Sequence, residues 1–169
     1  MNCSIAKAVI AAGGLLWLVC GQAEEHEAVL GFWLTEQGRA TIEIFNDCEV
    51  YYGRISGQRD PQYLPGEVEG MDGKERVDLK NPDPELRDRP IQDMVFMSGF
   101  VYSRGKFRTG DIYDAETGKT YSGQFWLDDD GTLKLRGYLG IPLLGRNTTW
   151  TRSVRHPWTE LSSSETEGE

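Results

Sequence analysis

The stretch Gly110-Asp-Ile-Tyr-Asp-Ala-Glu-Thr-Gly-Lys-Thr-Tyr121 decides the fold. Both of its ends alternate apolar and polar residues, and between them lies a short polar turn in which Gly118 can take a positive φ. This pattern predicts a β-hairpin with strands over Lys106 to Tyr113 and Thr120 to Leu127. A second turn follows at Asp128-Asp-Asp-Gly131, and short alternating runs continue beyond it.

The same criterion identifies eight candidate strands along the chain. They cover Leu30 to Thr35, Thr41 to Asn46, Glu49 to Ile55, Asp93 to Val101, Lys106 to Tyr113, Thr120 to Leu127, Leu133 to Leu139 and Asn147 to Ser153. Asn46-Asp47 is the expected turn between the second and third strands. Eight antiparallel strands in one domain fit a closed barrel that fills or encloses a small cavity. The sequence therefore predicts an all-β fold, a single antiparallel β-barrel of about eight strands.

The pattern breaks between Ser56 and Pro90, a long connection rich in Gly, Pro and charged residues. Connections of this length are usually functional or disordered. Within it, Asp83 can cap a helix, Pro84 suits the first helical position, and Glu85 favours the positive end of the helix dipole. We expect one short helical turn from Pro84 to Arg87, and such a turn can lie across a barrel mouth.

Residues 1–23 read as a secretory signal peptide, with Lys7 before the apolar run Ala8 to Val19. This run is too short to span a bilayer comfortably. Small residues before position 24 predict cleavage after Ala23, and hence a periplasmic or secreted protein without a transmembrane span. Lipid anchoring at Cys20 and an uncut membrane anchor are the alternatives.

The remaining chain divides into a flexible leader (24–28), a barrel domain (29–155) and a disordered acidic tail (156–169). The formal net charge of the chain is −9, which repels phosphates and excludes nucleic acid as a partner. Cys48 is the sole cysteine after residue 23, so no disulfide can form within the exported chain. The oligomeric state stays open.

A set of short stretches distributed over the barrel domain is distinctive in combination. They are Gly31-Phe-Trp-Leu-Thr35, Tyr52-Gly-Arg-Ile55, Asn81-Pro-Asp-Pro-Glu-Leu-Arg-Asp-Arg-Pro90, Gly110-Asp-Ile-Tyr-Asp114, Gly118-Lys-Thr-Tyr121, Leu135-Arg-Gly-Tyr-Leu-Gly140, Gly145-Arg146 and Trp150-Thr-Arg152. With them the chain resembles a family of small exported bacterial proteins known as domain of unknown function 2147. The resemblance implies a lipocalin-like, calycin-type β-barrel, and no established activity. A second cysteine that many members carry near the first is absent here, where Tyr51 and Tyr52 stand.

Gly31-Phe32-Trp33 is also similar to the Gly-x-Trp that opens lipocalin barrels. In those proteins an arginine near the last strand packs over the tryptophan and closes the barrel base, and Arg152 stands in the matching place in order. The resemblance therefore implies a contact between Trp33 and Arg152, of about 0.5–2 kcal/mol for a guanidinium over an indole.

Few residues in the chain indicate a catalytic or metal-binding role. His26 and His156 lie near the two ends, and Cys48 has no central histidine to activate it and is expected to be a half-buried, inert thiol. Asp111 and Asp114 are expected to serve as a strand-face charge and a turn residue rather than as a catalytic pair. Asp128-Asp-Asp-Gly131 reads as a turn, because calcium loops need alternating ligands. We expect no enzyme activity, no cofactor and no metal.

Arginines and aromatic residues carry the candidate ligand site. An inward arginine must be paired or bind an anion, so each is expected either to form a salt bridge to Asp83, Asp88 or Asp111, or to hold an acidic head group. Aromatic side chains are expected either to fill the core or to line an apolar cavity. The candidate ligand-binding residues are Tyr52, Arg54, Arg87, Arg89, Phe96, Tyr113, Tyr121, Trp126 and Arg136.

Three hypotheses follow. The first is an exported barrel that binds a small apolar or amphipathic ligand with an acidic head. The alternative is a non-enzymatic envelope protein-interaction module that acts through residues 56–90, which an exposed apolar patch on that loop and a solid barrel would favour. An enzyme is the third, which two carboxylates converging in a concave pocket would favour.

Overall fold

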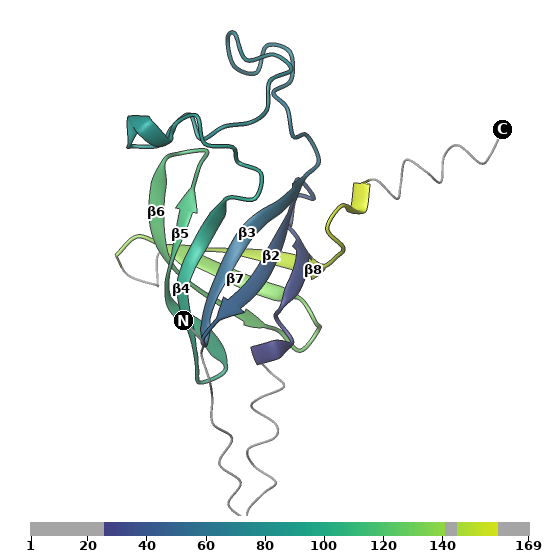
Figure 1. Cartoon of the computed structure of the whole chain (residues 1–169). Coiled ribbons are helices and arrows are strands. Elements are labelled where there is room, and N and C mark those ends of the chain that lie inside the picture. The colour runs from purple at the N-terminus through teal and green to yellow at the C-terminus, as the bar shows by residue number, and fades with distance from the viewer. Residues whose placement is uncertain (1–25, 141–144, 159–169) are drawn as a thin grey trace, which may run out of the picture.

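The computed structural model describes residues 26–140 and 145–158. Within them, eight antiparallel strands form a closed barrel in which each strand pairs with its neighbours along the chain and the last pairs with the first (Figure 1). The predicted all-β barrel of eight strands is confirmed. Its strands are β1 (Gly31–Leu34), β2 (Ala40–Asp47), β3 (Val50–Gln58), β4 (Val95–Ser103), β5 (Lys106–Asp114), β6 (Lys119–Leu127), β7 (Leu133–Tyr138) and β8 (Arg146–Arg152).

A two-residue turn at Cys48 and Glu49 joins β2 to β3, and these residues have φ angles of 47° and 68°. Two successive positive φ angles are typical of a type I′ hairpin turn, whose twist matches that of the flanking strands. β2 consequently continues through Asp47, and the turn expected at Asn46-Asp47 is wrong. The expectation of a half-buried thiol is also wrong, because Cys48 is exposed at this turn.

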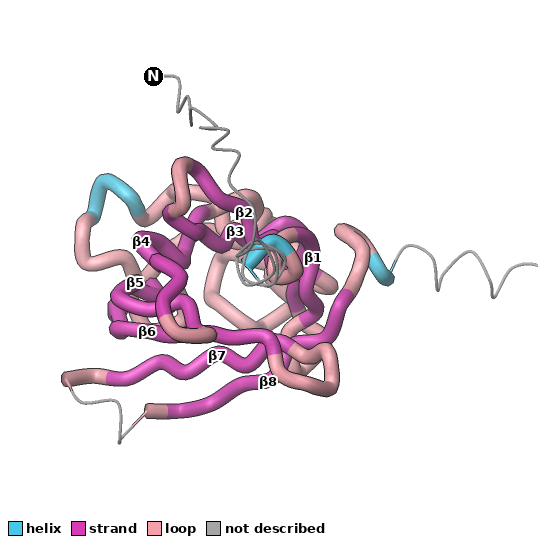
Figure 2. The backbone as a smooth tube through the Cα atoms, turned by 90° about the horizontal axis from the view of Figure 1, so that it is seen from below, coloured by secondary structure: helices cyan, strands magenta, loops and turns pink. Residues whose placement is uncertain are grey.

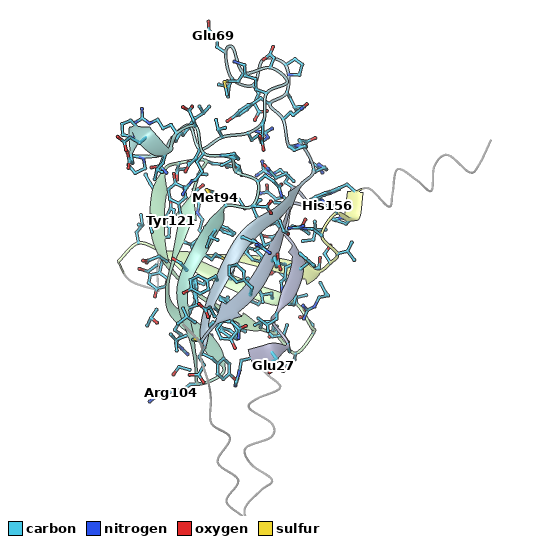
Figure 3. All side chains as sticks on the ribbon, viewed as in Figure 1. Glu27, Glu69, Met94, Arg104, Tyr121 and His156 are labelled. Atoms are coloured by element: carbon cyan, nitrogen blue, oxygen red, sulfur yellow. The ribbon has the colours of Figure 1, made fainter. Side chains whose placement is uncertain are left out.

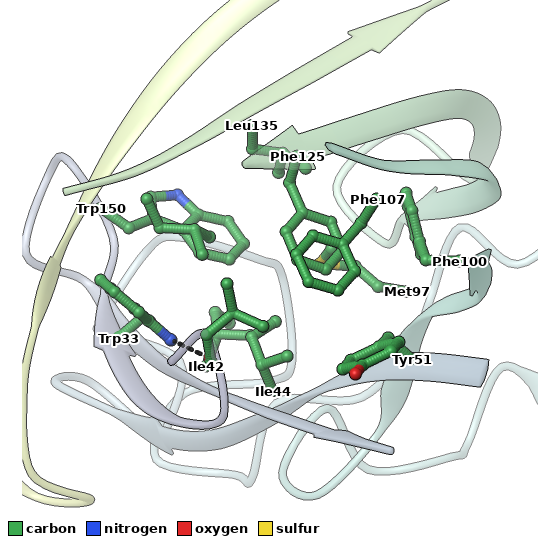
Figure 4. Close-up of a cluster of buried hydrophobic side chains, with 12 residues drawn as sticks. Trp33, Ile42, Ile44, Tyr51, Met97, Phe100, Phe107, Phe125, Leu135 and Trp150 are labelled. Carbon is green, nitrogen blue, oxygen red and sulfur yellow. Dashed lines mark hydrogen bonds between the residues drawn. The ribbon is translucent and has the colours of Figure 1, made fainter. Parts of the chain in front are cut away.

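Interlocked aromatic rings form the core of the barrel (Figure 4). The rings of Phe107 and Phe125 stack with their centroids 4.4 Å apart, and Phe100 meets Phe125 edge-on at 5.0 Å. Gly110 is required beside them, because a Cβ there would lie only 2.3 Å from the ring of Phe100. Aromatic pairs in these geometries stabilise a core beyond the area that they bury.

Residues 26–30 close one end of the barrel, which we call the base and which Figure 2 views from below. Val29 is fully buried, and its carbonyl oxygen accepts a hydrogen bond of 2.8 Å from Trp33 Nε1. The guanidinium of Arg152 lies 4.0 Å from the Trp33 ring centroid and donates to two carbonyl groups of this segment. The predicted contact between Trp33 and Arg152 is therefore present, and the leader expected over residues 24–28 packs against the barrel from residue 26 onward.

The connection between β3 and β4 crosses the opposite end of the barrel, the mouth (Figure 1). It has two parts. The first, the arm (residues 62–75), is closed by a bridge between Gln62 and Glu75, and Glu69 marks its tip in Figure 3, far from Glu27 and Arg104 at the base. The second, the roof (residues 76–91), is closed by a bridge between Val77 and Pro90.

The roof contains the single helical turn that the sequence predicts. This 3-10 turn, η1 (Pro84–Leu86), begins after Asp83, whose side chain accepts a hydrogen bond from the Glu85 amide. The local sequence accounts for the turn because a capping carboxylate, a proline at the first position and an acid in the first turn all favour it.

After β8 the chain turns back along the outside of the barrel as a strap (residues 153–158). The carbonyl oxygen of Arg155 accepts a hydrogen bond of 2.6 Å from the Thr41 hydroxyl, and Trp158 Nε1 donates to the carbonyl of Gly38 at 3.2 Å. The first residues of the expected disordered tail therefore hold the turn between β1 and β2; residues 159–169 lie outside the described part of the chain.

Candidate ligand-binding site

A chamber of about 830 Å³ lies in the mouth of the barrel. Its volume is within the 300–1,000 Å³ range of pockets that hold small molecules. The barrel wall contributes apolar side chains, and the roof contributes more from above. The apolar residues that line the chamber are Ala40, Ile42, Ile55, Val68, Val77, Leu79, Ile91, Met94, Phe96, Ile112, Ala115 and Trp150.

The chamber floor is the upper surface of the aromatic core. Ile42 and Trp150 belong both to the buried cluster and to the chamber lining, and the partly buried Ile55, Phe96 and Ile112 pack against that cluster. The filled base below them means that a ligand would enter and leave at the mouth.

A buried carboxylate ties the roof to the barrel wall. Asp78 is fully buried, and its Oδ1 accepts a hydrogen bond of 2.7 Å from the hydroxyl of Tyr113 on β5. Its Oδ2 accepts from Asn81 Nδ2 and from Arg89 Nη2, each at 2.7 Å. We call these four side chains the latch, because they join the beginning and the end of the roof to each other and to the barrel.

The latch shifts the ionisation of its members. Burial acts to raise the pKa of Asp78, but the hydrogen bonds from Asn81, Tyr113 and Arg89 together outweigh it, and the pKa lies below its ordinary value. Burial and the nearby carboxylate raise the pKa of Tyr113 to about 12. Asp78 is therefore charged and Tyr113 neutral at neutral pH, as the hydrogen bonds require.

The roof also touches the turn between β5 and β6. Gly118 has a φ of +69°, and a Cβ on it would lie 2.0 Å from the carbonyl oxygen of Lys80. The predicted positive φ at Gly118 is thus confirmed, and the absence of a side chain there lets the roof approach the hairpin.

A smaller recess of about 300 Å³ adjoins the chamber and opens between the β1–β2 and β5–β6 turns, beside β8. Five residues line both hollows, so the two are continuous along one side of the mouth: Thr35, Arg39, Ala40, Glu116 and Trp150. The side chains of Arg39 and Glu116 span this opening with their charged atoms 3.8 Å apart.

Most other charged groups around the chamber already have partners. Arg76 contacts both oxygens of Glu67 at 2.6 and 2.8 Å, and its Nε donates to the Asp60 carbonyl. The Asp114 carboxylate accepts from the Glu116 amide and the Thr117 hydroxyl within its own turn.

Only some of the residues predicted for the site lie there. Phe96 and Tyr113 line the chamber. Tyr121 shares the inner face of β6 with the buried Gly123 and Phe125, but it is not among the lining residues. Arg87 and Arg89 are in the roof, where Arg87 donates to the Asn81 carbonyl and Arg89 to Asp78, and neither lines the chamber.

The other predicted residues face outward, so their assignment to the chamber is wrong. Tyr52 stacks on Phe45, and Arg54 donates to Glu43 at 2.7 Å rather than to any of the expected aspartates. Trp126 is covered by the ammonium group of Lys106, 3.8 Å from a ring centroid. Arg136 donates to Asn147 across the β7–β8 pair.

Sequence reasoning missed Asp78, Arg39, Lys80 and most of the apolar lining. The alternation of Ile42 and Ile44 indicated an inner face of β2, but nothing local indicated which end of that face would stay open. Asp78 is preceded and followed by apolar residues in a loop. This pattern could have predicted a buried carboxylate with hydrogen-bond partners elsewhere in the chain.

The titratable acids that line the chamber are Asp60, Glu67, Asp114 and Glu116. Neither His26 nor His156 lines it, and Asp111 lies on the outer face of β5. Asp130 accepts hydrogen bonds from Thr132 in the turn after β6. Over residues 26–140 and 145–158, no group of three or more His, Cys, Asp or Glu side chains is placed to hold a metal ion, and no helix is of the length and hydrophobicity that a bilayer crossing needs.

Residues 31–152 match the family described as "Uncharacterized protein conserved in bacteria (DUF2147)", and the chain belongs to this family. Among solved structures it is similar to protein HP1028 from the human pathogen Helicobacter pylori, which is described as belonging to the lipocalin family. The two are 21% identical, with a TM-score of 0.63 over 79% of this chain and 88% of that one. No curated protein matches the chain. The barrel is thus lipocalin-like, and at this identity the similarity concerns the fold alone.

Proposed function

We propose that this member of the DUF2147 family is an exported barrel that binds a small apolar or amphipathic ligand, with an acidic head group, in its chamber. The observation that carries the proposal is the chamber itself: about 830 Å³ with walls that combine apolar and charged side chains, at the mouth of a barrel whose base is filled. A cavity of this size and lining is the common form of a small-molecule site.

The proposed role is binding rather than catalysis. General acid–base chemistry needs a titratable group within hydrogen-bonding reach of a bound substrate. Four carboxylates line the chamber. Glu67 and Asp114 accept hydrogen bonds from protein donors on both oxygens, Asp60 accepts one from Arg59, and Glu116 forms an ion pair with Arg39. We accordingly propose that the protein has no enzymatic activity.

Export is part of the same proposal. The signal-like residues 1–23 lie outside the described part of the chain, and their sequence favours a periplasmic or secreted protein. A carrier in this compartment would meet ligands that are poorly soluble in water, which an apolar chamber suits.

Native mass spectrometry tests the proposal. The exported protein is recovered from the periplasm of a bacterial host without detergent, and we expect an additional small-molecule mass that denaturation releases. In the variant Ala40→Trp, whose new ring lies at the junction of the chamber and the recess, the fraction carrying this mass falls. The control is Ser122→Trp, on the exposed outer face of β6. A bare protein mass that persists after incubation with lipid extracts would exclude the proposal.

One observation favours the interaction module as a second candidate. Leu64 in the arm and Leu86 in η1 are 53% and 40% exposed. Single exposed leucines are common on monomers, and these two lie in different parts of the connection, so they form a weaker argument than the chamber. Proximity labelling in the periplasm distinguishes the two: a specific protein partner that is lost in the double variant Leu64→Ser and Leu86→Ser would favour the module.

A further inference from the structure

A β-bulge turns the side chain of Gln58 into the chamber. The register of the β2–β3 pair shifts at Ser56, a residue that β3 carries in excess. Ile55 and Gln58 both line the chamber as a result, although a regular strand places residues three apart on opposite faces. Gln58 lies opposite Ala40, which lines the chamber as well. Gly57 faces the strap instead, where a Cβ would lie 2.6 Å from a backbone carbonyl oxygen.

The bulge is held in place by side chains on both sides. Ser56 is fully buried, and its hydroxyl donates to the carbonyl of Thr41 at 3.1 Å. The Ser56 carbonyl in turn accepts a hydrogen bond of 3.0 Å from Gln92 Nε2. Bulges re-aim side chains in this way and are frequent beside functional sites. The inward direction of Gln58 is therefore fixed by the surrounding structure.

The Gln58 amide has no partner in the part of the chain that the structure describes. It is partly buried, its Nε2 is enclosed by protein atoms, and it forms no hydrogen bond within residues 26–140 and 145–158. Buried polar groups are rarely left in this state, so a group from outside the protein is the expected partner. The other neutral polar side chains of the lining all form hydrogen bonds: Thr35 with the Ala40 amide, Tyr63 with Val77, Tyr113 with Asp78 and Thr117 with Asp114.

The position of this amide favours an uncharged partner. A carboxamide is neutral and offers two N–H donors and one carbonyl acceptor. Its neighbours on the strand pair, Ile55 and Ala40, are apolar, so an ionised group bound here would need a cation of its own. Arg39 and Arg76, the arginines of the lining, already face carboxylates. A carbonyl oxygen is less costly to desolvate, and one N–H donor satisfies it.

We propose that Gln58 orients the ligand by donating from its amide to an uncharged carbonyl group of that ligand, as a ketone, an ester or an amide would present. The last torsion of a glutamine side chain is soft, and rotation about it brings Nε2 from the wall to the chamber. This inference rests on the proposed function. It adds the residue that recognises a polar group of the ligand, and that group is independent of the charge of the ligand's head.

Displacement of the uncharged fluorescent dye N-phenyl-1-naphthylamine tests the inference on the protein recovered from the periplasm. The competitors are three eleven-carbon probes: 2-undecanone, which only accepts, undecanamide, which accepts and donates, and 1-undecene, which does neither. Each probe is compared between wild type and variant, so that its own hydration cancels. In Gln58→Leu we expect 2-undecanone and undecanamide to bind about three- to tenfold more weakly, the worth of one neutral hydrogen bond. 1-Undecene binds at least as tightly as before, which also shows that the chamber is intact.

Two further variants assign the effect to a donor in the chamber. Gln58→Glu keeps the size of the side chain but presents only acceptors, so it loses affinity for 2-undecanone and keeps its affinity for the N–H groups of undecanamide. Gln124→Leu, on the outer face of β6, changes the binding of none of the probes.

An unchanged affinity for 2-undecanone in Gln58→Leu, or an equal loss for 1-undecene, would overturn the inference and leave the proposed function standing. Failure of the dye and all three probes to bind the wild type would overturn both.

Discussion

Replacing Asp78 with alanine should release the roof from the barrel while the barrel stays folded. The change removes the acceptor for three donors at once: the Tyr113 hydroxyl, the Asn81 amide and the Arg89 guanidinium. Arg89 is partly exposed and can recover a hydrogen bond from water, but Asn81 is only 5% exposed and Tyr113 is partly buried.

The magnitude follows from these partners. Leaving one buried donor and one partly buried donor unsatisfied costs at most about 1–3 kcal/mol each, and part of this is offset because a charge no longer has to be buried. We take about 3 kcal/mol, near the lower end of what breaking a buried ion pair costs. A domain is stable by about 5–15 kcal/mol, so the barrel survives. Because 1.4 kcal/mol is a factor of ten, the roof should open about 100-fold more often.

Amide hydrogen exchange measures this directly. The amides of Asp78, Asn81 and Arg89 donate within the roof, to the carbonyls of Arg89, Asp78 and Leu86 respectively, and their protection should fall about 100-fold in Asp78→Ala. Asp78→Asn should also lose protection, because its amide keeps one acceptor oxygen but presents an NH2 group to the donors at the other position. Protection in the core strands should change little. The matched control is Asp111→Asn, an exposed acid on the same strand as Tyr113, which should leave the roof unchanged. A loss of less than fivefold in Asp78→Ala, or an equal loss in the control, would refute the role of the latch.

Three further predictions follow. Because hydrogen bonds lower the pKa of Asp78 in the folded state, its stabilisation is present above the ordinary aspartate pKa of about 3.9 and is lost as the pH falls below it. The thermal unfolding midpoints of wild type and Asp78→Asn should therefore converge below about pH 4. Because the pKa of Tyr113 is raised to about 12, the wild type should also lose stability between about pH 10 and 12, and Tyr113→Phe should abolish this loss. Gly118→Ala should lower the urea midpoint by more than Gly131→Ala, because both glycines have positive φ but only the first would place a Cβ against a carbonyl oxygen; equal losses would contradict the contact with Lys80. Arg152→Ala should lower the free energy of unfolding by about 2 kcal/mol in chemical denaturation, because it removes the contact with Trp33 and two hydrogen bonds. A loss no larger than that of the exposed Arg146→Ala would be evidence against the closure of the base by Arg152.

Sequence was sufficient for the architecture because the strands have a local cause, although the turn between β2 and β3 lies at Cys48 and Glu49 rather than at the predicted residues. The period-two pattern and the glycine-containing turns predicted the eight strands, and the residues around Pro84 predicted η1. Membership of the family, first indicated by short matching stretches, is confirmed over residues 31–152.

The ligand-binding site was harder to predict than the fold, because alternation along a strand shows which residues share a face and not which face lies inside the barrel. On β3 the inner face carries Gly53, and a Cβ there would lie 2.9 Å from the sulfur of Met97. The larger Tyr52 and Arg54 are outside, where Phe45 and Glu43 cover them. Tyr51, with the same ring as Tyr52, is buried in the core, so ring size could not identify the inner face of β3. Gly53 is on the inner face because Met97 of the neighbouring strand fills the space beside it.

The latch could not be foreseen for a different reason. Asp78 and Tyr113 are 35 residues apart, and neither is in a motif that implies the other. Their contact exists because the closed barrel brings the end of β5 under the roof. Non-local pairs of this kind depend on the completed topology rather than on local propensity.

The base and the chamber lie at opposite ends of the molecule, and this gives the barrel a polarity. The chain reaches the barrel at the base, through Val29 and the ring of Trp33, whereas the roof and the recess are at the far end. The described chain enters at the sealed end and the chamber opens at the other, so whatever delivers or collects a ligand would approach the barrel from the end opposite to His26.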